Sequence, residues 1–147
     1  MSQITRRHRI WEVFLVNKLN YKWNEVHDLA EQLEHIESDD LVKRLEGFLD
    51  YPVVDPHGDP IPDEHGRVKK IKTQPLASAP LKKKLSIISL ANSSVEFLNY
   101  LDKLGLSIGD NIEITEIEPY DNSLSPRHKK NHITVSKEAA ENLFVTV

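Results

Sequence analysis

The sequence predicts an α+β protein in which an all-helical N-terminal domain precedes a small β-barrel. In the first third of the chain, apolar residues recur at spacings of three and four, which is the period of an amphipathic helix. Beyond residue 80 they occur in short runs or alternate with polar residues, as strands do. Between these parts, Val53–Pro80 is rich in Pro, Gly, Asp and Ser and has no sustained period. We therefore expect two domains separated by a loop and a linker.

Three helices are expected in the N-terminal domain. The first is amphipathic and spans Thr5–Leu19. The second begins with Asn24 as its N-cap, because an Asn side chain accepts a hydrogen bond from an unpaired N–H of the first turn. The third begins at Ser38, since a hydroxyl cap and the acidic residues that follow it suit the positive end of a helix. Pro52 ends this helix, whose buried face is expected to be Leu41, Leu45, Phe48 and Leu49.

The C-terminal domain is expected to contain short strands and two small helices. The strands are expected at Leu85–Leu90, 111–117, His132–Val135 and Phe144–Val147. A helix over Ser93–Leu104 is followed by Gly105, where a left-handed C-cap is favoured, and Ser136 caps a short helical turn. The residues of the longer helix that face inward are expected to be Val95, Leu98 and Leu101. Short strands around a small helix predict a barrel of SH3-like topology.

The two parts of the chain differ in charge. Residues 1–66 carry 7 Lys and Arg against 14 Asp and Glu, whereas residues 67–147 carry 12 against 9. This asymmetry favours two modules, which we expect to be a helical domain over 1–66, a linker over 67–80 and an SH3-like domain over 81–147. Arg67–Lys84 carries seven basic residues and no acid. We interpret it as a solvated linker, with contact to a nucleic acid or an acidic partner as the alternative.

The composition excludes several classes of protein. The chain has 147 residues, a net charge of −4, and seven His but no Cys. Without Cys there is no disulfide framework, no thiolate zinc site and no cysteine nucleophile. No apolar run approaches the roughly 20 residues of a membrane span, and the first residues lack the apolar stretch of a signal peptide. We therefore expect a cytoplasmic protein without membrane contact, in which any metal is bound by His, Asp and Glu.

His and Glu residues at helical spacing form the candidate site. His8 and Glu12 are four residues apart on the first helix, and the second helix carries another stripe, namely His27, Glu31, Glu34 and His35. No Lys or Arg interrupts that stripe, whereas a solvated face would more often mix its charges. Imidazoles and carboxylates on two packed helices offer six ligands for one or two divalent cations. The alternative is a set of solvated or hydrogen-bonded side chains. The remaining histidines that we interpret as structural or exposed are His57, His65, His128 and His132.

Several strings of this sequence resemble the diphtheria toxin repressor and iron-dependent repressor family. The strings RRHRIWEVFL, VHDLAEQLEH, SDDLVKRLEGFL and DPHGDPIP resemble its metal-binding and dimerisation domain, in the same order and at similar spacing. The strings NYLDKLGLSIGDNIEI and HITVSKEAAENLFV resemble the SH3-like domain that these repressors share with ferrous iron transport A-type proteins. The resemblance covers essentially the whole chain.

The resemblance implies two metal sites between the helices. The positions that match the family's ligands are His8, Glu12, His27, Glu31, Glu34 and His35. The position of Glu31 is commonly Cys in iron-responsive members and Glu in manganese transport regulators. A carboxylate suits hard Mn(II) better than a thiolate does, so Mn(II) is favoured and Fe(II) is the second candidate. By affinity alone, Zn(II), Co(II) or Ni(II) would also substitute in vitro.

The resemblance also concerns regions beyond these helices. The family's SH3-like domain lends further ligands from the helix near Ser93–Glu96, where Glu96 matches one and Ser93 stands at the other, which leaves that contribution open. Family members begin with a winged helix-turn-helix domain that contacts operator DNA and supplies one or two ligands. This sequence begins at what resembles the dimerisation helix. We therefore expect it to be part of a longer regulator, to bind metal more weakly without those ligands, and to reach operator DNA only through the missing domain.

The predicted function is the metal-sensing and homodimerising part of a metal-dependent transcription regulator, and not an enzyme. The apolar residues expected to provide core and self-contact are Ile10, Trp11, Phe14, Leu41, Leu45 and Phe48. One alternative is a non-catalytic module whose barrel binds a Pro-rich segment such as TQPLASAP. The other is a carboxylate-bridged metalloenzyme, which the spacing disfavours because di-iron bundles use Glu-x-x-His motifs on two helices.

Overall fold

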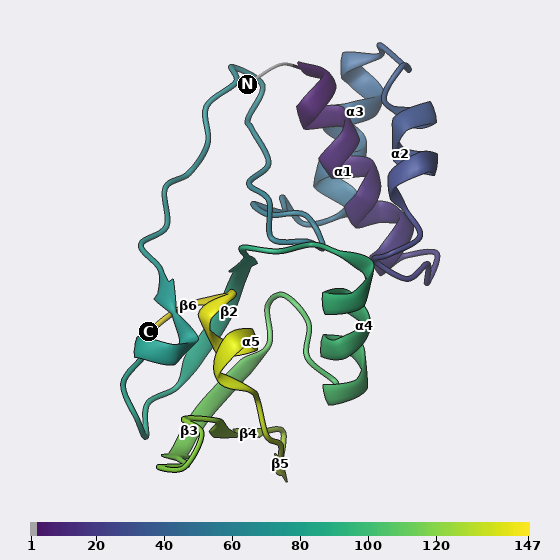
Figure 1. Ribbon diagram of the computed structural model, residues 1–147. Coiled ribbons are helices and arrows are strands. Elements are labelled where there is room, and N and C mark those ends of the chain that lie inside the picture. The colour runs from purple at the N-terminus through teal and green to yellow at the C-terminus, as the bar shows by residue number, and fades with distance from the viewer. Residues whose placement is uncertain (1–2) are drawn as a thin grey trace. The chain divides into compact units, whose positions relative to one another are not determined.

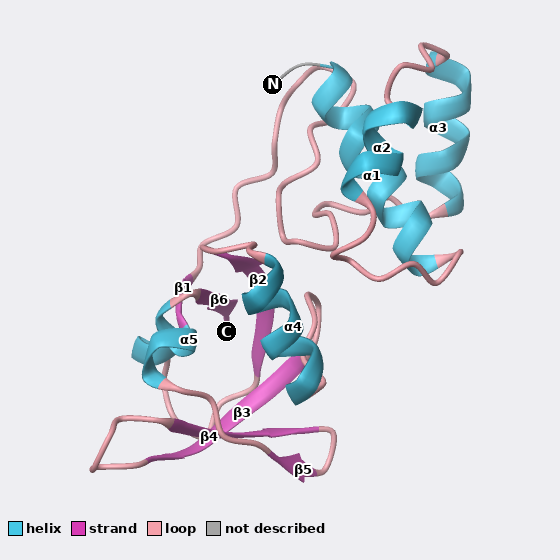
Figure 2. Ribbon diagram, turned by 45° about the vertical axis from the view of Figure 1, so that its right-hand side comes forward, coloured by secondary structure: helices cyan, strands magenta, loops and turns pink. Residues whose placement is uncertain are grey.

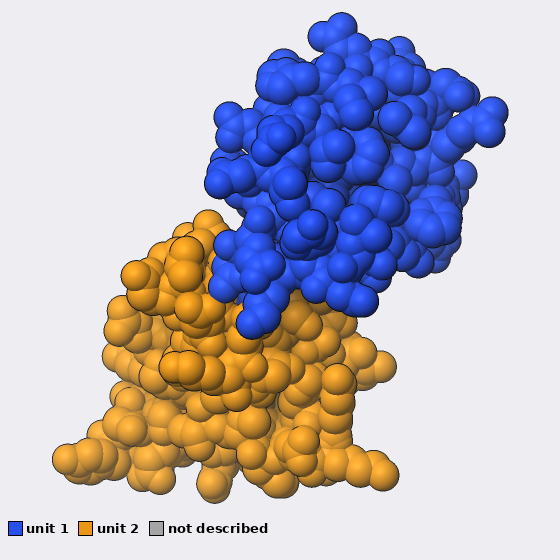
Figure 3. All heavy atoms as spheres, turned by 90° about the vertical axis from the view of Figure 1, so that its right-hand side faces the viewer, with its two compact units in different colours: residues 1–70 blue, residues 71–147 orange. Residues whose placement is uncertain are grey.

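The chain folds into two compact units, residues 1–70 and residues 71–147, coloured separately in Figure 3. The computed structural model describes residues 3–147. The order of the elements is helices first and then a sheet with two further helices (Figure 1). This confirms the predicted α+β class. Within residues 3–147, no helix has the length and apolar character that crossing a membrane requires.

The first unit contains three helices, α1 (Gln3–Asn17), α2 (His27–Leu33) and α3 (Asp39–Phe48). The long helix α1 packs against both α2 and α3 (Figure 2). Its two buried sides form separate apolar clusters. The cluster toward α3 contains Ile10, Val13, Val42, Leu45 and Ile61, and the cluster toward α2 contains Leu15, Val26 and Ala30. Because α1 contributes to both clusters, its packing against α2 and α3 fixes where its own polar side chains lie.

The second helix begins later than predicted. Helix α2 starts at His27, and its N-cap residue is Val26, which makes no side-chain capping bond. The prediction of Asn24 as N-cap was therefore wrong. Val26 is fully buried in the cluster with Leu15 and Ala30, so packing rather than capping fixes this end of the helix. Ser38 does cap α3, since its hydroxyl oxygen accepts a hydrogen bond from the backbone N–H of Leu41 at 3.2 Å.

The buried face of α3 differs from the prediction. Val42 and Leu45 are buried, whereas Leu41 and Phe48 are 38% and 62% exposed. Leu45 was predicted correctly, and the assignment of Leu41 and Phe48 to the buried face was wrong. Leu41 and Phe48 lie at one edge of the apolar stripe of α3, and packing against a single neighbour leaves that edge uncovered. The side chains that face away from α1 therefore remain at the surface of the unit.

The second unit is an antiparallel sheet of six strands. The strands are β1 (Gln74–Pro75), β2 (Leu85–Leu90), β3 (Asn111–Ile117), β4 (Leu124–His128), β5 (Asn131–His132) and β6 (Leu143–Thr146), in the spatial order β1-β6-β2-β3-β4-β5. A 3₁₀ turn, η1 (Leu76–Ser78), and two helices, α4 (Val95–Leu104) and α5 (Lys137–Glu141), complete it. Alternating residues of the strands, such as Leu85, Ile87, Ile112, Ile114, Leu143 and Val145, form the core.

Three details of the second unit depart from the sequence prediction. Strand β4 was not predicted, because Pro126 and His128 occupy two of its buried positions and mask the apolar alternation. The predicted strand His132–Val135 is reduced to Asn131–His132, while Val135 forms an isolated bridge with Leu124. Val95, expected to face inward, is exposed on the first turn of α4. Gly105 adopts the predicted left-handed C-cap conformation, with φ of 76°.

Candidate metal centre

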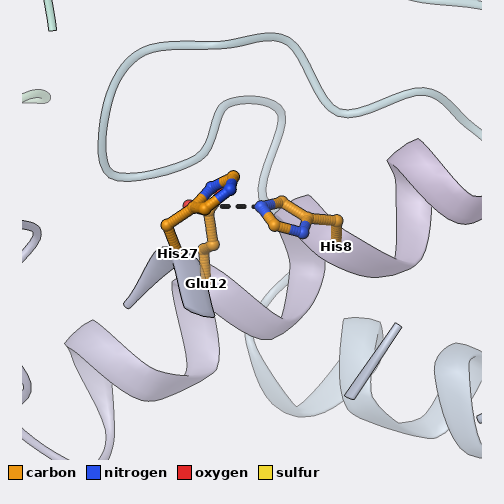
Figure 4. A group of neighbouring side chains, drawn as sticks. All are labelled: His8, Glu12 and His27. Carbon is orange, nitrogen blue, oxygen red and sulfur yellow. Dashed lines mark ion pairs between the residues drawn. The ribbon is translucent and has the colours of Figure 1, made fainter. Parts of the chain in front are cut away.

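Three of the predicted ligands, His8, Glu12 and His27, converge between α1 and α2 (Figure 4). His8 and Glu12 lie one turn apart on α1, and His27 is the first residue of α2. One ligand atom from each residue lies within 4.8 Å of the others, and His8 Nε2 is 3.6 Å from Glu12 Oε2. The rings of His8 and His27 have centroids 5.0 Å apart. These two imidazoles and one carboxylate are therefore grouped in the way that the ligands of a divalent transition metal are grouped.

Glu34 orients the ring of His8. It is the C-cap residue of α2, and its Oε2 lies 2.7 Å from His8 Nδ1. A carboxylate accepts, so His8 Nδ1–H donates and Nε2 is left to face Glu12. Metal-binding imidazoles commonly bond a carboxylate through the nitrogen that does not face the metal.

Burial and proximity change the acidities of these groups. The pKa of His8 is raised, mainly by its hydrogen bond to Glu12 and, against the effect of burial, by the charges of Glu12 and Glu34. Burial raises the pKa of Glu12, and the hydrogen bond from His8 works in the opposite direction. A buried carboxylate requires a positive neighbour, which a protonated imidazole or a metal ion supplies.

The other predicted ligands are not members of this three-residue group, although Glu34 contacts His8 and Glu31 contacts His27. The exposed side chains of His27 and Glu31 approach to 3.8 Å and, with Asp28, form a second and solvent-facing group on α2. His35 Nε2 is 4.0 Å from Glu34 Oε1 and is also exposed. Within residues 3–147, Glu31, Glu34 and His35 do not come together as one three-ligand group. Glu96 lies in the other unit, on the first turn of α4.

The loop after α3 adds two residues that sequence reasoning did not assign to the site. His57 was interpreted as structural or exposed, but its side chain is only 13% exposed and its Nδ1 lies 3.4 Å from Glu12 Oε2. Asp55 Oδ2 lies 3.8 Å from the same nitrogen. A loop residue has no helical period to link it to α1, so spacing could not reveal this contact. Among the remaining histidines, His65 is exposed beside Glu64, and His128 is buried against Asp110 at 3.2 Å.

Asp55 and Glu12 raise the pKa of His57 to about 9. Burial on its own would lower it, but the hydrogen bond and charge of Asp55 and the charge of Glu12 outweigh that effect. Burial would also raise the pKa of Asp55, yet the hydrogen bonds that it accepts from His57 and from the backbone N–H of Asp59 leave it lowered. The loop therefore adds a second imidazole and a second buried carboxylate next to Glu12.

Two family models match the chain, one for each unit. Residues 1–63 match the metal binding and dimerisation domain of the iron dependent repressor, and residues 74–147 match the FeoA domain. The first match contains every predicted ligand except Glu96.

Curated relatives match part of the chain. A probable metal transport system membrane protein of Chlamydia trachomatis is 43% identical over 61 residues, which are 42% of this chain and 14% of that protein. The iron-dependent repressor IdeR of Mycobacterium tuberculosis is 41% identical over 59 residues, which are 40% of this chain and 26% of that repressor. The chain thus spans about a quarter or less of the length of these relatives.

Solved structures match both units. A manganese-dependent transcriptional repressor in complex with manganese has a TM-score of 0.79 and 32% identity, and the match covers 98% of this chain and 69% of that one. ScaR with bound Zn2+ has a TM-score of 0.70 and 32% identity, covering 97% of this chain and 70% of that one. The matched domains and these structures confirm the predicted resemblance. The chain belongs to the iron-dependent repressor family of metal-dependent transcriptional repressors, of which it contains the metal-binding and dimerisation domain and the FeoA domain.

Proposed function

We propose that this chain is the metal-sensing and homodimerising part of a transcription regulator that controls metal homeostasis in the cytoplasm. The observation that carries the proposal is the convergence of His8, Glu12 and His27, with Glu34 holding the far nitrogen of His8. Three ligand atoms from two helices, with one ring oriented by a further carboxylate, are what a transition-metal site requires. Family membership supports regulation rather than catalysis.

We assign the metal as Mn(II), with Fe(II) as second candidate. The donors are imidazole nitrogen and carboxylate oxygen, and the chain has no Cys to supply a softer thiolate. One solved relative is named as manganese-dependent, and another was solved with Zn2+. Zn(II), Co(II) and Ni(II) are expected to bind in vitro as well, because the affinity of a site depends on the identity of the metal as much as on the ligands. In this proposal the remaining ligands are Glu31, Glu34, His35 and, from the barrel, Glu96.

The self-association surface in this proposal is an apolar patch that includes Leu41 and Phe48 of α3, both of which are exposed. Phe48 also approaches Phe14 of α1, with ring centroids 6.4 Å apart, so the patch continues onto a second helix. Exposed apolar patches of this kind mark association surfaces. A two-fold dimer would bury the patch on both copies, and paired operator half-sites require such a two-fold reader.

The metal would act by linking α1 to α2. An ion bound to His8 and Glu12 of α1 and to His27 of α2 favours the arrangement in which these helices are close, so it shifts the protein toward that state. In the whole regulator, this state would set the distance between the two DNA-contacting parts of the dimer so that they match the half-sites of an operator. The helical unit itself carries a strong excess of acid, which disfavours contact with phosphates.

Calorimetric titration of Mn(II) into the chain tests this proposal. We expect Glu12→Gln and His27→Ala to weaken Mn(II) binding by at least about tenfold, because each removes a ligand. His132→Ala is the matched control, since this exposed imidazole lies in the barrel. Identical isotherms for all four proteins would refute the metal-sensing role.

A further inference from the structure

A basic hollow lies on the barrel unit, over strands β3, β4 and β5, which pair side by side in that order (Figure 2). It has a volume of about 530 Å³. Four of its lining residues are Lys or Arg and one is an acid, namely Lys84, Arg127, Lys129, Lys130 and Glu113. Residues 71–147 as a whole carry nine Lys and Arg against nine Asp and Glu. The positive charge of this unit is therefore concentrated in the basic hollow.

The pairing of the strands places charged side chains in one row across the sheet. Glu113 of β3 is opposite Arg127 of β4, and Arg127 is opposite His132 of β5. Lys84 directly precedes β2 and comes beside Glu113, because β2 and β3 pair in antiparallel register. Residues that pair directly point to the same face of a sheet. Neighbouring strands lie about 4.8 Å apart, so the row is about 14 Å long.

The lysines of the basic hollow have no acidic partner. Arg127 Nη2 lies 3.3 Å from Glu113 Oε2, which neutralises the one arginine. Among residues 3–147, no carboxylate comes within 4.0 Å of the ammonium groups of Lys84, Lys129 or Lys130. All three lysines are exposed. A solvated face more often mixes its charges, so this arrangement favours the binding of an anion.

The turn between β4 and β5 carries lysine where the backbone favours other residues. Lys129 and Lys130 are the two residues between the paired His128 and Asn131, and their φ angles are 58° and 136°. Two-residue hairpin turns with positive φ favour Asn-Gly or Asp-Gly, because a Cβ is disfavoured in this region. Folding of the hairpin therefore does not explain these two lysines, whereas an anion that binds to them does.

We propose that the basic hollow binds the phosphate groups of duplex DNA. Lys and Arg neutralise phosphates and release their counterions. One strand of a duplex carries a phosphate for about every 3.4 Å of its axis, so a row of about 14 Å spans about four phosphates. Single-stranded nucleic acid would require aromatic rings on which bases stack, and no Phe, Tyr or Trp is among the described residues that line the hollow.

This contact would hold a duplex without reading its sequence, since phosphate contacts carry no base information. It is independent of the candidate metal centre, because every residue of the basic hollow belongs to residues 71–147. The prediction that the chain reaches operator DNA only through another domain would then hold for sequence-specific contacts alone.

Amide NMR of the full chain during titration with a short DNA duplex at low salt tests the site. We expect the amides of 127–132 to shift, while those of α5 stay unchanged. Non-specific DNA binding has a Kd of about 10⁻⁴ to 10⁻⁶ M, so the shifts should approach saturation at about 1 mM duplex. An absence of shifts in 127–132 at that concentration would refute the site.

An oligomer of glutamate is the competing probe in the same experiment. If it shifts the amides of 127–132 with an affinity equal to or higher than that of the duplex, the basic hollow is a site for an acidic peptide and the proposal is overturned. A weaker effect of the oligomer supports the assignment to DNA phosphates.

A double variant, Lys129→Asn with Lys130→Gly, tests the role of the turn. It removes two positive charges and introduces the residues that the φ angles favour, so the hairpin should remain folded. We expect the affinity for a fluorescent duplex, measured by anisotropy, to fall at least about tenfold. The slope of log K against log salt should become less steep by about 1.8, since each phosphate contact contributes about 0.9.

The matched control is Lys103→Gln with Lys137→Gln. It removes the same charge from helices α4 and α5 of the same unit, outside the basic hollow. Its salt slope should equal that of the wild type. If both double variants lose the same affinity, binding depends on net charge alone and the site is refuted. Unchanged affinity in the variant of Lys129 and Lys130 would refute it as well.

Discussion

The carboxylate of Glu34 lies 2.7 Å from Nδ1 of His8 and connects the C-terminal end of α2 with α1. This bond determines which nitrogen of His8 faces Glu12. It also joins the two helices at the point where the candidate metal centre begins. Glu34 therefore has two roles in the proposed site, since it orients one ligand and is itself a candidate ligand.

Glu34→Ala is expected to weaken Mn(II) binding by about 10- to 100-fold, because it removes the acceptor that orients His8. Glu34→Gln keeps a carbonyl acceptor for His8 Nδ1–H and should lose less affinity than Glu34→Ala. Calorimetric titration of the two variants measures this order. Glu37→Ala, an exposed acid just beyond α2, is the control and should bind as the wild type. Equal affinities for Glu34→Ala and the wild type would count against the orienting role.

The pair of Arg6 and Glu46 links α1 to α3. Arg6 Nη1 and Nη2 lie 2.9 and 3.0 Å from the two carboxylate oxygens of Glu46, and the Arg6 side chain is buried. Glu46→Ala leaves that guanidinium without its charged partner, so we expect the free energy of unfolding to fall by about 3 kcal/mol. Urea denaturation measures the loss. Asp40→Ala, which breaks the exposed pair with Arg44, should cost no more than about 0.5 kcal/mol.

The sequence predicted those elements whose signals are local. Ser38 and Gly105 were assigned correctly because a helix cap depends on the residue itself and its nearest backbone neighbours. The start of α2 was predicted wrongly, because the burial of Val26 against Leu15 depends on tertiary packing. Strand β4 was missed for a similar reason, since Pro126 and His128 are buried there only because of their neighbours in the sheet.

Those residues of the candidate site that lie on helices could be predicted from their spacing in the sequence. The period of α1 brought His8 and Glu12 together, and the stripe at helical spacing on the second helix supplied His27 as their partner. His57 is 45 residues from Glu12 along the chain and lies on a loop, so no periodicity connects them. A contact of that kind is set by the path of the loop around α1.

Gly105→Ala is expected to destabilise the barrel unit by about 1 kcal/mol. The φ of 76° at Gly105 lies in the left-handed region, which disfavours any residue with a Cβ. Gly47→Ala is the matched control, because Gly47 lies within α3 and the nearest atom to an added Cβ is Tyr51 Oη at 3.5 Å. Gly47→Ala should be neutral or stabilise the helical unit by up to about 1 kcal/mol. Thermal or urea unfolding of both variants measures the difference.

Phe48→Glu is expected to convert the proposed dimer into a monomer, since it places a charge in the apolar patch. The side chain is already 62% exposed, so its replacement should leave the fold of the single copy intact. Sedimentation velocity at several concentrations measures the change. Tyr120→Glu alters an even more exposed aromatic residue in the barrel and should leave the association unchanged. A wild-type chain that sediments as a monomer at high concentration would contradict the dimer.

Removal of Mn(II) with a chelator is expected to loosen the helical unit selectively. A ligand present at 100 times its Kd stabilises the state that binds it by about 2.7 kcal/mol, so amide exchange in α1 and α2 should slow with Mn(II) and recover on chelation. Hydrogen-exchange mass spectrometry resolves the two units. Exchange in α4 decides the role of Glu96, because Mn(II) should protect Val95–Leu104 only if Glu96 contributes a ligand. Protection of α4 that disappears in Glu96→Gln would establish that ligand, whereas protection that persists would exclude it.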